Sequence, residues 1–231
     1  MDDKILTKNI IDKIKKGKHT KFLNLRELNL VIPHLKKEKL KYDVYFPYRN
    51  ADKAIIYYGY LPDITCFEID TNATLKHSDI LGSIFALSIE IENFGSIIVD
   101  NDKYYIIVLS SIANYVKYNL INIGKCNVSL NEVDIKIIEN YENNYIELNL
   151  TVSSERIDNV IASITGFSRA KTTLLMKEKN ILLNYNILLN NSYTIKENDV
   201  FSIRKFGKYK YIGIIKITKS DKLIIKILKY D

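Results

Sequence analysis

The spacing of apolar residues changes twice along this chain of 231 residues, and each change restricts the folds that it can adopt. Up to about residue 50, isoleucines such as Ile10, Ile11 and Ile14 recur at helical spacing, with lysines on the opposite face. From about Ala54 the pattern favours strands that alternate with helices, and beyond residue 153 it favours two helices followed by strands. The sequence therefore predicts an α+β protein with three parts, 1–50, 51–152 and 153–231.

The first part is expected to be mainly helical. Asn24-x-x-Glu27 has the spacing of a capping box, which predicts a helix that runs to about Ile32 and stops at Pro33. Residues 40–50 favour a loop or an edge strand. This segment contains aromatic and basic side chains that could stack on RNA bases. The alternative is a hydrophobic strap that packs the helices onto the second part. The residues are Tyr45, Phe46, Tyr48 and Arg49.

The second part is expected to be an α/β sandwich. The predicted strands are 54–60, 65–69, 96–99, 103–109 and 125–130, and the predicted helices begin at Ser78 and Ser111. Two helices against an antiparallel sheet suggest a ferredoxin-like, or RRM-like, fold. Residues 145–152 then form either its last strand or a strap to the third part.

Charge is divided unevenly among the three parts. Lysine and arginine against aspartate and glutamate number 13 to 6 in residues 1–50, 6 to 14 in 51–152, and 15 to 7 in 153–231. The net charges of +7, −8 and +8 add up to the overall +7. Basic regions bind polyanions by releasing condensed counterions, so the two ends, and above all the last third, favour a nucleic-acid partner.

Several classes of site find no support in the residues. Cys66 and Cys126 are isolated and are expected to be buried thiols in a reducing cytoplasm, and the three histidines have no metal-ligand or triad spacing. No Gly-x-Gly loop occurs, and no apolar run reaches the length of a signal peptide or a membrane span. We therefore expect a cytoplasmic, monomeric, non-enzymatic protein with no catalytic residue, cofactor, metal or membrane partner.

The sharpest candidate site lies in the last third. Ser168 is predicted to cap a helix that runs to about Lys177, with Arg169 and Lys171 in its first turn. Cations there oppose the helix dipole, but they make sense if a phosphate binds where amides, dipole and cations converge. The alternative is tolerated surface charge.

A second helix is predicted just before it, capped by Ser153 or Ser154 and running to about Ser163. Arg156 in its first turn is expected to contact RNA, while Asp158 orients a basic side chain or caps the neighbouring helix; an internal ion pair between the two is the alternative. Arg204, Lys205 and Lys208 could extend the basic face. The full set of predicted RNA-binding residues is Arg156, Asp158, Ser168, Arg169, Lys171, Thr172, Asn184, Arg204, Lys205 and Lys208.

The order of these residues resembles the S4 domain, a small RNA-binding module named after a ribosomal protein. Its signature is an Arg-Leu-Asp start, Ser-Arg plus a basic residue at a helix start, an Asn-Gly turn and a late Gly-Asp. The corresponding stretches here are Arg156-Ile157-Asp158, Ser168-Arg169-Ala170-Lys171, Asn184 and Asn198-Asp199. Asn180, Asn186 and Asn198 stand where the family has glycines, and asparagine tolerates the positive φ that such turns need.

A wider resemblance, to the YlmH family of bacterial S4-domain proteins, covers nearly the whole chain. The matching segments are Leu23–Arg26, Tyr45–Lys53, His77–Ser83, Phe94–Ile97, Ile112–Val116, Ile123–Lys125 and Thr151–Ser154. The resemblance implies a helical N-terminal part, a ferredoxin-like middle and a C-terminal S4 domain of the αL type. It also implies a ribosome-associated protein that binds large-subunit ribosomal RNA, with peptidyl-tRNA, in quality control of stalled nascent chains.

Two other functions fit parts of the sequence. An RNA-modifying enzyme, of the pseudouridine synthase or methyltransferase type, could use an S4 domain for targeting, but it would need a catalytic site elsewhere in the chain. A protein-interaction adaptor would leave the basic face of the last third unexplained.

Overall fold

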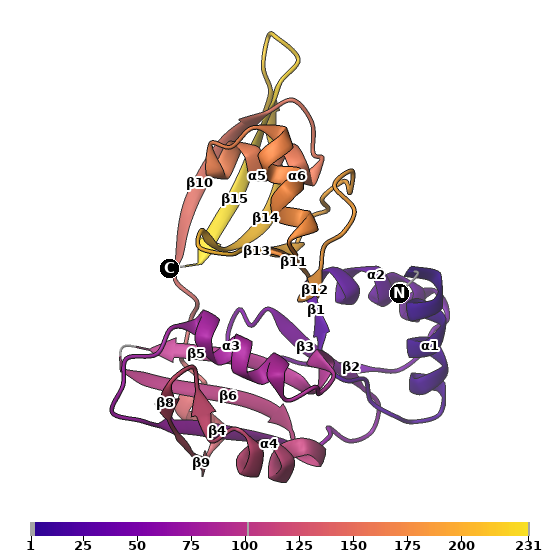
Figure 1. The fold of residues 1–231 in the computed structure, drawn as a ribbon. Coiled ribbons are helices and arrows are strands. Elements are labelled where there is room, and N and C mark those ends of the chain that lie inside the picture. The colour runs from indigo at the N-terminus through magenta and orange to yellow at the C-terminus, as the bar shows by residue number, and fades with distance from the viewer. Residues whose placement is uncertain (1–2, 101, 231) are drawn as a thin grey trace. The chain divides into compact units, whose positions relative to one another are not determined.

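The computed structural model describes residues 3–100 and 102–230, and the chain divides into two compact units, Met1–Glu142 (unit 1) and Asn143–Asp231 (unit 2) (Figure 1). In the described residues, no helix is long and apolar enough to cross a membrane. Each unit has hydrophobic clusters of its own.

Unit 1 contains four α-helices and nine strands within the described residues. They are α1 (Asp3–Lys15), β1 (Leu23–Asn24), α2 (Leu25–Lys37), β2 (Asp43–Tyr45), β3 (Lys53–Tyr57), β4 (Ile64–Asp70), α3 (His77–Ala86), β5 (Phe94–Asp100), β6 (Lys103–Leu109), α4 (Ala113–Asn119), β7 (Asn122–Ile123), β8 (Cys126–Asn127) and β9 (Ser129–Val133). Short 3-10 helices occupy Ile91–Asn93, Ser110–Ile112 and Ile135–Ile138.

The start of α2 is the predicted capping box. The Glu27 backbone N–H donates to Asn24 Oδ1 at 2.9 Å, and the Asn24 N–H donates to Glu27 Oε2 at 3.0 Å. The predicted stop at Pro33 is wrong, because α2 continues to Lys37. Its apolar stripe extends past the proline to Leu35, which is fully buried, and this burial offsets the backbone hydrogen bond that proline cannot donate.

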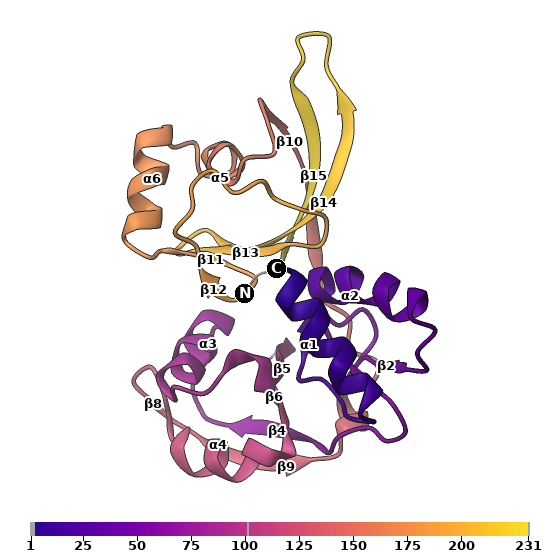
Figure 2. The same ribbon diagram turned by 90° about the vertical axis from the view of Figure 1, so that its right-hand side faces the viewer.

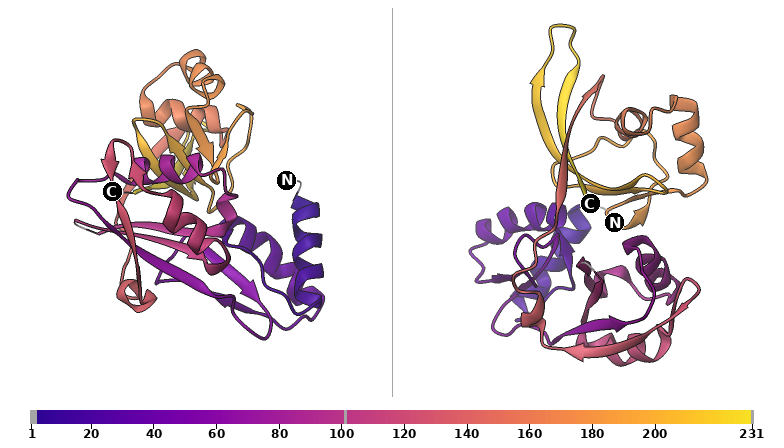
Figure 3. Two further views of the ribbon diagram at one scale, coloured as in Figure 1. Left: turned by 60° about the horizontal axis from the view of Figure 1, so that its bottom comes forward. Right: turned by 90° about the vertical axis from the view of Figure 1, so that its left-hand side faces the viewer.

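Unit 1 is layered around two antiparallel sheets, ordered β1-β3-β2 and β5-β6-β4-β9 (Figures 1 and 3). On one face of the second sheet, Ile106 and Val108 pack with Ile80 and Ile84 of α3 and with Val116 of α4. The alternate residues of β6 face the first sheet, which α1 and α2 cover on its far side.

Strand β3 shows why 1–50 and 51–142 form one unit. Ile55 packs toward the second sheet, whereas Ala54 and Ile56 pack against α1 and α2, so both faces of the strand are buried. The residues predicted as a helical part and the residues predicted as a sandwich therefore share their cores. Tyr48 is one of the shared core residues, buried against Tyr141, and it packs as the strap alternative predicted.

The two cysteines differ in their surroundings. Cys66 is buried in β4, as predicted, and burial raises the pKa of its thiol to about 12. Cys126 is only half-buried, so the prediction of burial is wrong for this residue. Both are free thiols.

Unit 2 is built on one antiparallel sheet with the order β10-β15-β14-β13-β11-β12 (Figure 2). Its elements are β10 (Tyr145–Val152), α5 (Ile157–Thr165), α6 (Arg169–Lys177), β11 (Ile181–Leu183), β12 (Asn186–Ile187), β13 (Val200–Ile203), β14 (Gly207–Ile217) and β15 (Leu223–Tyr230). Its core joins α5 and α6 to the sheet through residues such as Ile161, Met176 and Phe201.

The chain divides after residue 142, whereas the sequence predicts a boundary after residue 152, because strand β10 belongs to unit 2. It pairs along its whole length with β15, from Tyr145 opposite Tyr230 to Val152 opposite Leu223. Its interactions lie at the far end of the sequence, so the local pattern, which left the choice between strand and strap open, could not assign it.

Gly95 tests how tightly the sheets of unit 1 are packed. A Cβ at this position in β5 would lie 2.8 Å from Phe22 Cζ and 3.2 Å from Ile107 Cγ2. We predict that Gly95→Ala lowers the free energy of unfolding by about 1–3 kcal/mol, because the ring would have to move in a filled core. Urea unfolding measures this change.

The matched control is Gly82→Ala in α3, where a Cβ meets nothing within 4 Å. That variant should gain roughly 0.5–1 kcal/mol, because alanine favours a helix interior. Equal effects of the two substitutions would contradict the packing described for β5.

Candidate nucleic-acid interface

The N-terminus of α6 has the predicted cap. Ser168 is extended (φ −64°, ψ 157°), and its Oγ accepts a hydrogen bond from the Lys171 backbone N–H at 3.3 Å. The first turn contains no acidic residue, unlike those of α1, α2, α3 and α5, and it carries Arg169 and Lys171, both exposed. The helix end and two cations are thus close together.

The N-terminus of α5 lies later than predicted. The helix begins at Ile157 and not at Ser153 or Ser154, and Arg156 precedes its first residue. The reason is long-range pairing: the Ile157 N–H donates to the Tyr193 carbonyl at 2.8 Å, and the Ile195 N–H donates to the Glu155 carbonyl at 2.9 Å. This extended bridge holds the preceding residues out of the helix.

Arg156 and Asp158 form an internal ion pair, which is the alternative that the sequence leaves open for these two residues. Arg156 Nε and Nη2 donate to the two carboxylate oxygens at 3.1 and 2.8 Å. These bonds hold the pKa of the buried Asp158 carboxyl below its ordinary value. The carboxylate also accepts from the Asn159 backbone N–H at 2.9 Å. Since 46% of the Arg156 side chain is exposed, the pair still presents a guanidinium to solvent.

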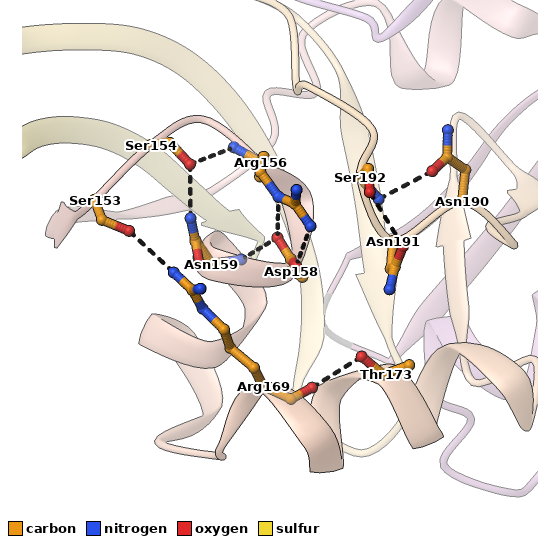
Figure 4. Close-up of polar contacts among 10 residues, drawn as sticks. All are labelled: Ser153, Ser154, Arg156, Asp158, Asn159, Arg169, Thr173, Asn190, Asn191 and Ser192. Carbon is orange, nitrogen blue, oxygen red and sulfur yellow. Dashed lines mark hydrogen bonds and ion pairs between the residues drawn. The ribbon is translucent and has the colours of Figure 1, made fainter.

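Two serines hold the starts of the helices: Ser153 links the segment before α5 to α6, and Ser154 bonds to α5 itself (Figure 4). Arg169 Nη2 donates to Ser153 Oγ at 3.3 Å, and Asn159 Nδ2 donates to Ser154 Oγ at 2.6 Å. Figure 4 shows Arg169 reaching from α6 toward the segment that also carries Arg156. The two helix starts and the two arginines therefore meet at one surface.

Lys171 rests on an aromatic pair. Its Nζ lies 3.6 Å from the centroid of the Phe167 ring, and that ring meets Phe206 edge-on at 5.4 Å between centroids. The cation–π contact keeps the ammonium group beside the start of α6. Phe206 belongs to the turn between β13 and β14, so this turn packs beside the α5–α6 connection.

The same turn carries two more predicted residues, and a third follows it in β14. Arg204 is exposed, with Nη1 3.4 Å from Asn180 Oδ1, and Lys205 has a positive φ of 72° at the turn. Lys208 is half-buried, with its Nζ 4.0 Å from the centroid of the Tyr230 ring. Arg204 and Lys205 thus extend the basic surface, whereas Lys208 packs on aromatic rings.

Thr172 and Asn184 serve the fold of unit 2. Thr172 is fully buried and donates to the Ser168 carbonyl at 3.2 Å. Asn184 has φ 49° in the turn between β11 and β12, and its side chain bonds Asp199 and the Val200 N–H. Both side chains therefore stabilise the segments that carry the basic surface.

Asp199 is the buried anchor of this region. Its carboxylate accepts from Asn184 Nδ2 at 2.7 Å, the Tyr193 hydroxyl at 2.9 Å and the Lys196 N–H at 2.8 Å. Its neighbour Asn198 has the predicted positive φ. At the other two asparagines that stand in place of family glycines, Asn180 and Asn186, the positive φ lies one residue earlier, at Lys179 and Tyr185.

Four organising residues are absent from the predicted set: Ser153, Asn159, Phe167 and Phe206. Phe167 directly precedes the Ser168 cap, and an aromatic residue at this position is a local signal for packing at the helix start. The local sequence of Ser153 predicts only a helix cap, and nothing in it indicates that Ser153 meets Arg169, sixteen residues away. Among the described residues, no group of three or more His, Cys, Asp or Glu side chains could hold a metal ion.

The fold and this surface define a two-unit α+β protein whose C-terminal unit carries a basic surface at two helix starts. Comparison with known proteins is more specific. Residues 63–137 match a family model described as "Putative RNA-binding domain in YlmH". The chain is 28% identical over 234 positions to the "Ribosome-associated protein quality control protein P2" of Bacillus subtilis, with 96% of this chain and 91% of that protein aligned.

A solved structure supports the fold. The "Cell division protein ylmH from Streptococcus pneumoniae" superimposes with a TM-score of 0.51 at 22% identity, covering 61% of this chain and 96% of the other. Together the three comparisons confirm the resemblance to the YlmH family that the sequence predicts.

Asp158 generates a prediction about stability. Asp158→Ala should lose about 1–2 kcal/mol, because it removes an ion pair and the acceptor of the Asn159 N–H. Asp158→Asn, which keeps an acceptor oxygen but not the charge, should lose less. Because the folded pKa is lowered, the charge stabilises the protein fully above the unfolded value of about 3.9 and less as pH falls below it.

Urea unfolding of wild type and Asp158→Asn at pH 7 and pH 3 measures this. The difference between them should shrink at the lower pH. A difference that is the same at both values would mean that the ion pair does not stabilise the fold.

Proposed function

We propose that this protein is a non-enzymatic RNA-binding protein that binds ribosomal RNA through unit 2, on the large ribosomal subunit with peptidyl-tRNA, during quality control of stalled nascent chains. The observation that carries the proposal is the convergence of Arg156, Arg169 and the α6 N-terminus on one surface.

The distribution of charge over the two units supports unit 2 as the RNA-binding part. Unit 1 has 19 basic and 19 acidic residues, so its net charge is zero. Unit 2 has 15 basic and 8 acidic residues, so it carries the entire net charge of +7. Counterion release on RNA binding should therefore come mainly from unit 2.

The chemistry of the helix start fits a phosphate. An anion at the N-terminus of α6 would meet backbone N–H groups and the positive end of the helix dipole. Arg169 and Lys171 stand in the first turn, and Arg156 is linked to Arg169 through the Ser153–Asn159 segment. The guanidinium of Arg169 could bind two phosphate oxygens at once, which a lysine cannot do.

The topology fits the proposed domain types. Unit 1 contains the order β4-α3-β5-β6-α4-β9, and its sheet order β5-β6-β4-β9 is that of a ferredoxin-like sandwich. The two helices α5 and α6 before the strands of unit 2 fit an S4 domain, here with the preceding strand β10 included.

The relative from Bacillus subtilis supports the ribosome as the partner, since its name describes a ribosome-associated quality control protein. We accordingly propose large-subunit ribosomal RNA, with tRNA nearby, and quality control factors as partners of a cytoplasmic monomer.

The matched family model assigns RNA binding to residues 63–137, which carry 5 basic and 10 acidic residues. A net charge of −5 opposes phosphate, so we propose that this region is a spacer or a protein-contact surface.

The variants Arg169→Ala and Lys171→Ala test the surface. Both should weaken pelleting with 50S subunits, and each should flatten the salt dependence by about 0.9 per lost phosphate contact on a duplex-like target. Wild type should pellet with 50S more than with 30S subunits. Arg169→Lys keeps the positive charge but loses the two-point geometry of the guanidinium. Near-normal pelleting of this variant would indicate that charge alone matters, and a large loss would indicate two-point binding.

Thermal melting is the control, because neither variant should change stability by more than about 1 kcal/mol. The Arg169–Ser153 bond is exposed, and the loss of the Lys171–Phe167 contact is offset by removing a cation from the helix start. Normal pelleting with an early melt would show that this helix start is structural.

A further inference from the structure

A second charged surface lies at the tip of the β14–β15 hairpin of unit 2. Strands β14 and β15 form a hairpin that extends beyond β13, and its turn also projects beyond β10, which pairs with β15 as far as Leu223 (Figures 1 and 2). Between Gly207 and Tyr230 it contains seven lysines and one acidic residue, Asp221. This surface takes no part in the convergence of Arg156 and Arg169.

The hairpin is hydrogen-bonded up to its turn. Strand β13 pairs with β14 only from Gly207 to Lys210, but the ladder with β15 continues to Ile217 opposite Leu223. The turn is closed by the Thr218 N–H, which donates to the Lys222 carbonyl at 2.7 Å, and by the Lys222 N–H, which donates to Thr218 Oγ1 at 3.0 Å. A ribbon of this kind is preorganised for binding.

Apolar side chains are exposed on this part of β14. Ile214, Ile215 and Ile217 are 46%, 50% and 65% exposed. The register shifts between Tyr211 and Gly213 and between Ile214 and Lys216, and such bulges turn adjacent side chains outward. An exposed apolar edge would invite pairing with a second copy, but the lysines at the tip make two copies repel each other.

Three lysines at the tip are free to meet an anion. Lys226 is paired with Glu147 and Lys208 lies over Tyr230, so both are used within the fold. Lys216, Lys219 and Lys222 are exposed, and no carboxylate of the described residues forms an ion pair with them. The tip therefore combines a concentrated positive charge with an apolar edge, and its charge selects a polyanion.

From these features we infer that the β14–β15 hairpin is a second RNA contact and that its ligand is an RNA double helix. No aromatic residue occurs from Ile212 to Lys229, so the tip lacks the stacking platforms that bind single strands. In a duplex, lysines can bind the phosphates while the isoleucines lie against sugars and base edges in the wide, shallow minor groove. The inference rests on the proposed function, since it assumes RNA as the ligand of unit 2.

The experiment uses the full chain and a labelled RNA hairpin with a stem of about 16 base pairs, measured by fluorescence anisotropy at several salt concentrations. The triple variant Lys216→Ala, Lys219→Ala, Lys222→Ala should bind about tenfold or more weakly. Its salt slope should fall by roughly 2–3, because each lost phosphate contact contributes about 0.9.

The double variant Ile215→Thr, Ile217→Thr should weaken binding with an unchanged salt slope, because it removes apolar contact and no charge. Threonine keeps the strand propensity, so the hairpin should stay folded. The matched control, Lys117→Ala, Lys125→Ala, Lys136→Ala, removes three exposed lysines from the acidic middle and should bind within about twofold of wild type.

Each other outcome overturns the inference. Equal losses in the two lysine triples would show an effect of net charge alone. Equal losses on a single-stranded oligouridine would exclude duplex recognition. If the tip variants bind RNA normally but pellet poorly with ribosomes, the occupant is a protein. If wild type and the tip variants bind the RNA hairpin equally well, only the hairpin contact is refuted. If wild type does not bind the RNA at all, the proposed function is refuted as well.

Discussion

The buried carboxylate of Asp199 holds unit 2 in the shape on which its surface depends. It ties the β11–β12 turn, through Asn184, to the loop that carries Tyr193 and Lys196. A buried charge is tolerated only when it is well hydrogen-bonded, and these three donors come from two separate segments, the β11–β12 turn and the loop before β13. The carbonyl of the same residue accepts the Tyr211 N–H, which adds β14 to the network.

The network continues to the candidate RNA surface. The Tyr211 hydroxyl donates to Glu155 Oε1 at 2.5 Å, and burial together with this bond raises the pKa of that hydroxyl. Glu155 and Ile157 bridge to the Tyr193–Ile195 segment, which delays the start of α5 and places Arg156 where it pairs with Asp158. Fixed in this way, the segment presents Ser153 to Arg169, so the positions of both arginines depend on a carboxylate buried beneath them. Preorganisation of this kind lowers the entropy cost of binding.

Local signals predicted local features well, and long-range pairing explains the failures. The Asn24 capping box and the Ser168 cap depend on residues three positions apart, and both are present. The assignment of β10 depends on β15, about eighty residues away, and the start of α5 depends on Tyr193, so the sequence pattern placed neither. For Thr172 and Asn184 the motif predicts RNA contacts, which stay predictions, and the structure adds that Thr172 is buried and that the Asn184 side chain bonds Asp199.

The most direct test of the account compares the two units as separate chains, since each has its own hydrophobic core. Both should melt cooperatively, and their binding to ribosomal RNA is then measured at moderate salt. We predict that 143–231, with its net charge of +7, binds far more tightly than 1–142, whose net charge is zero. Equal affinities, or tighter binding by 1–142, would contradict it and would place RNA recognition in the region that the family model describes.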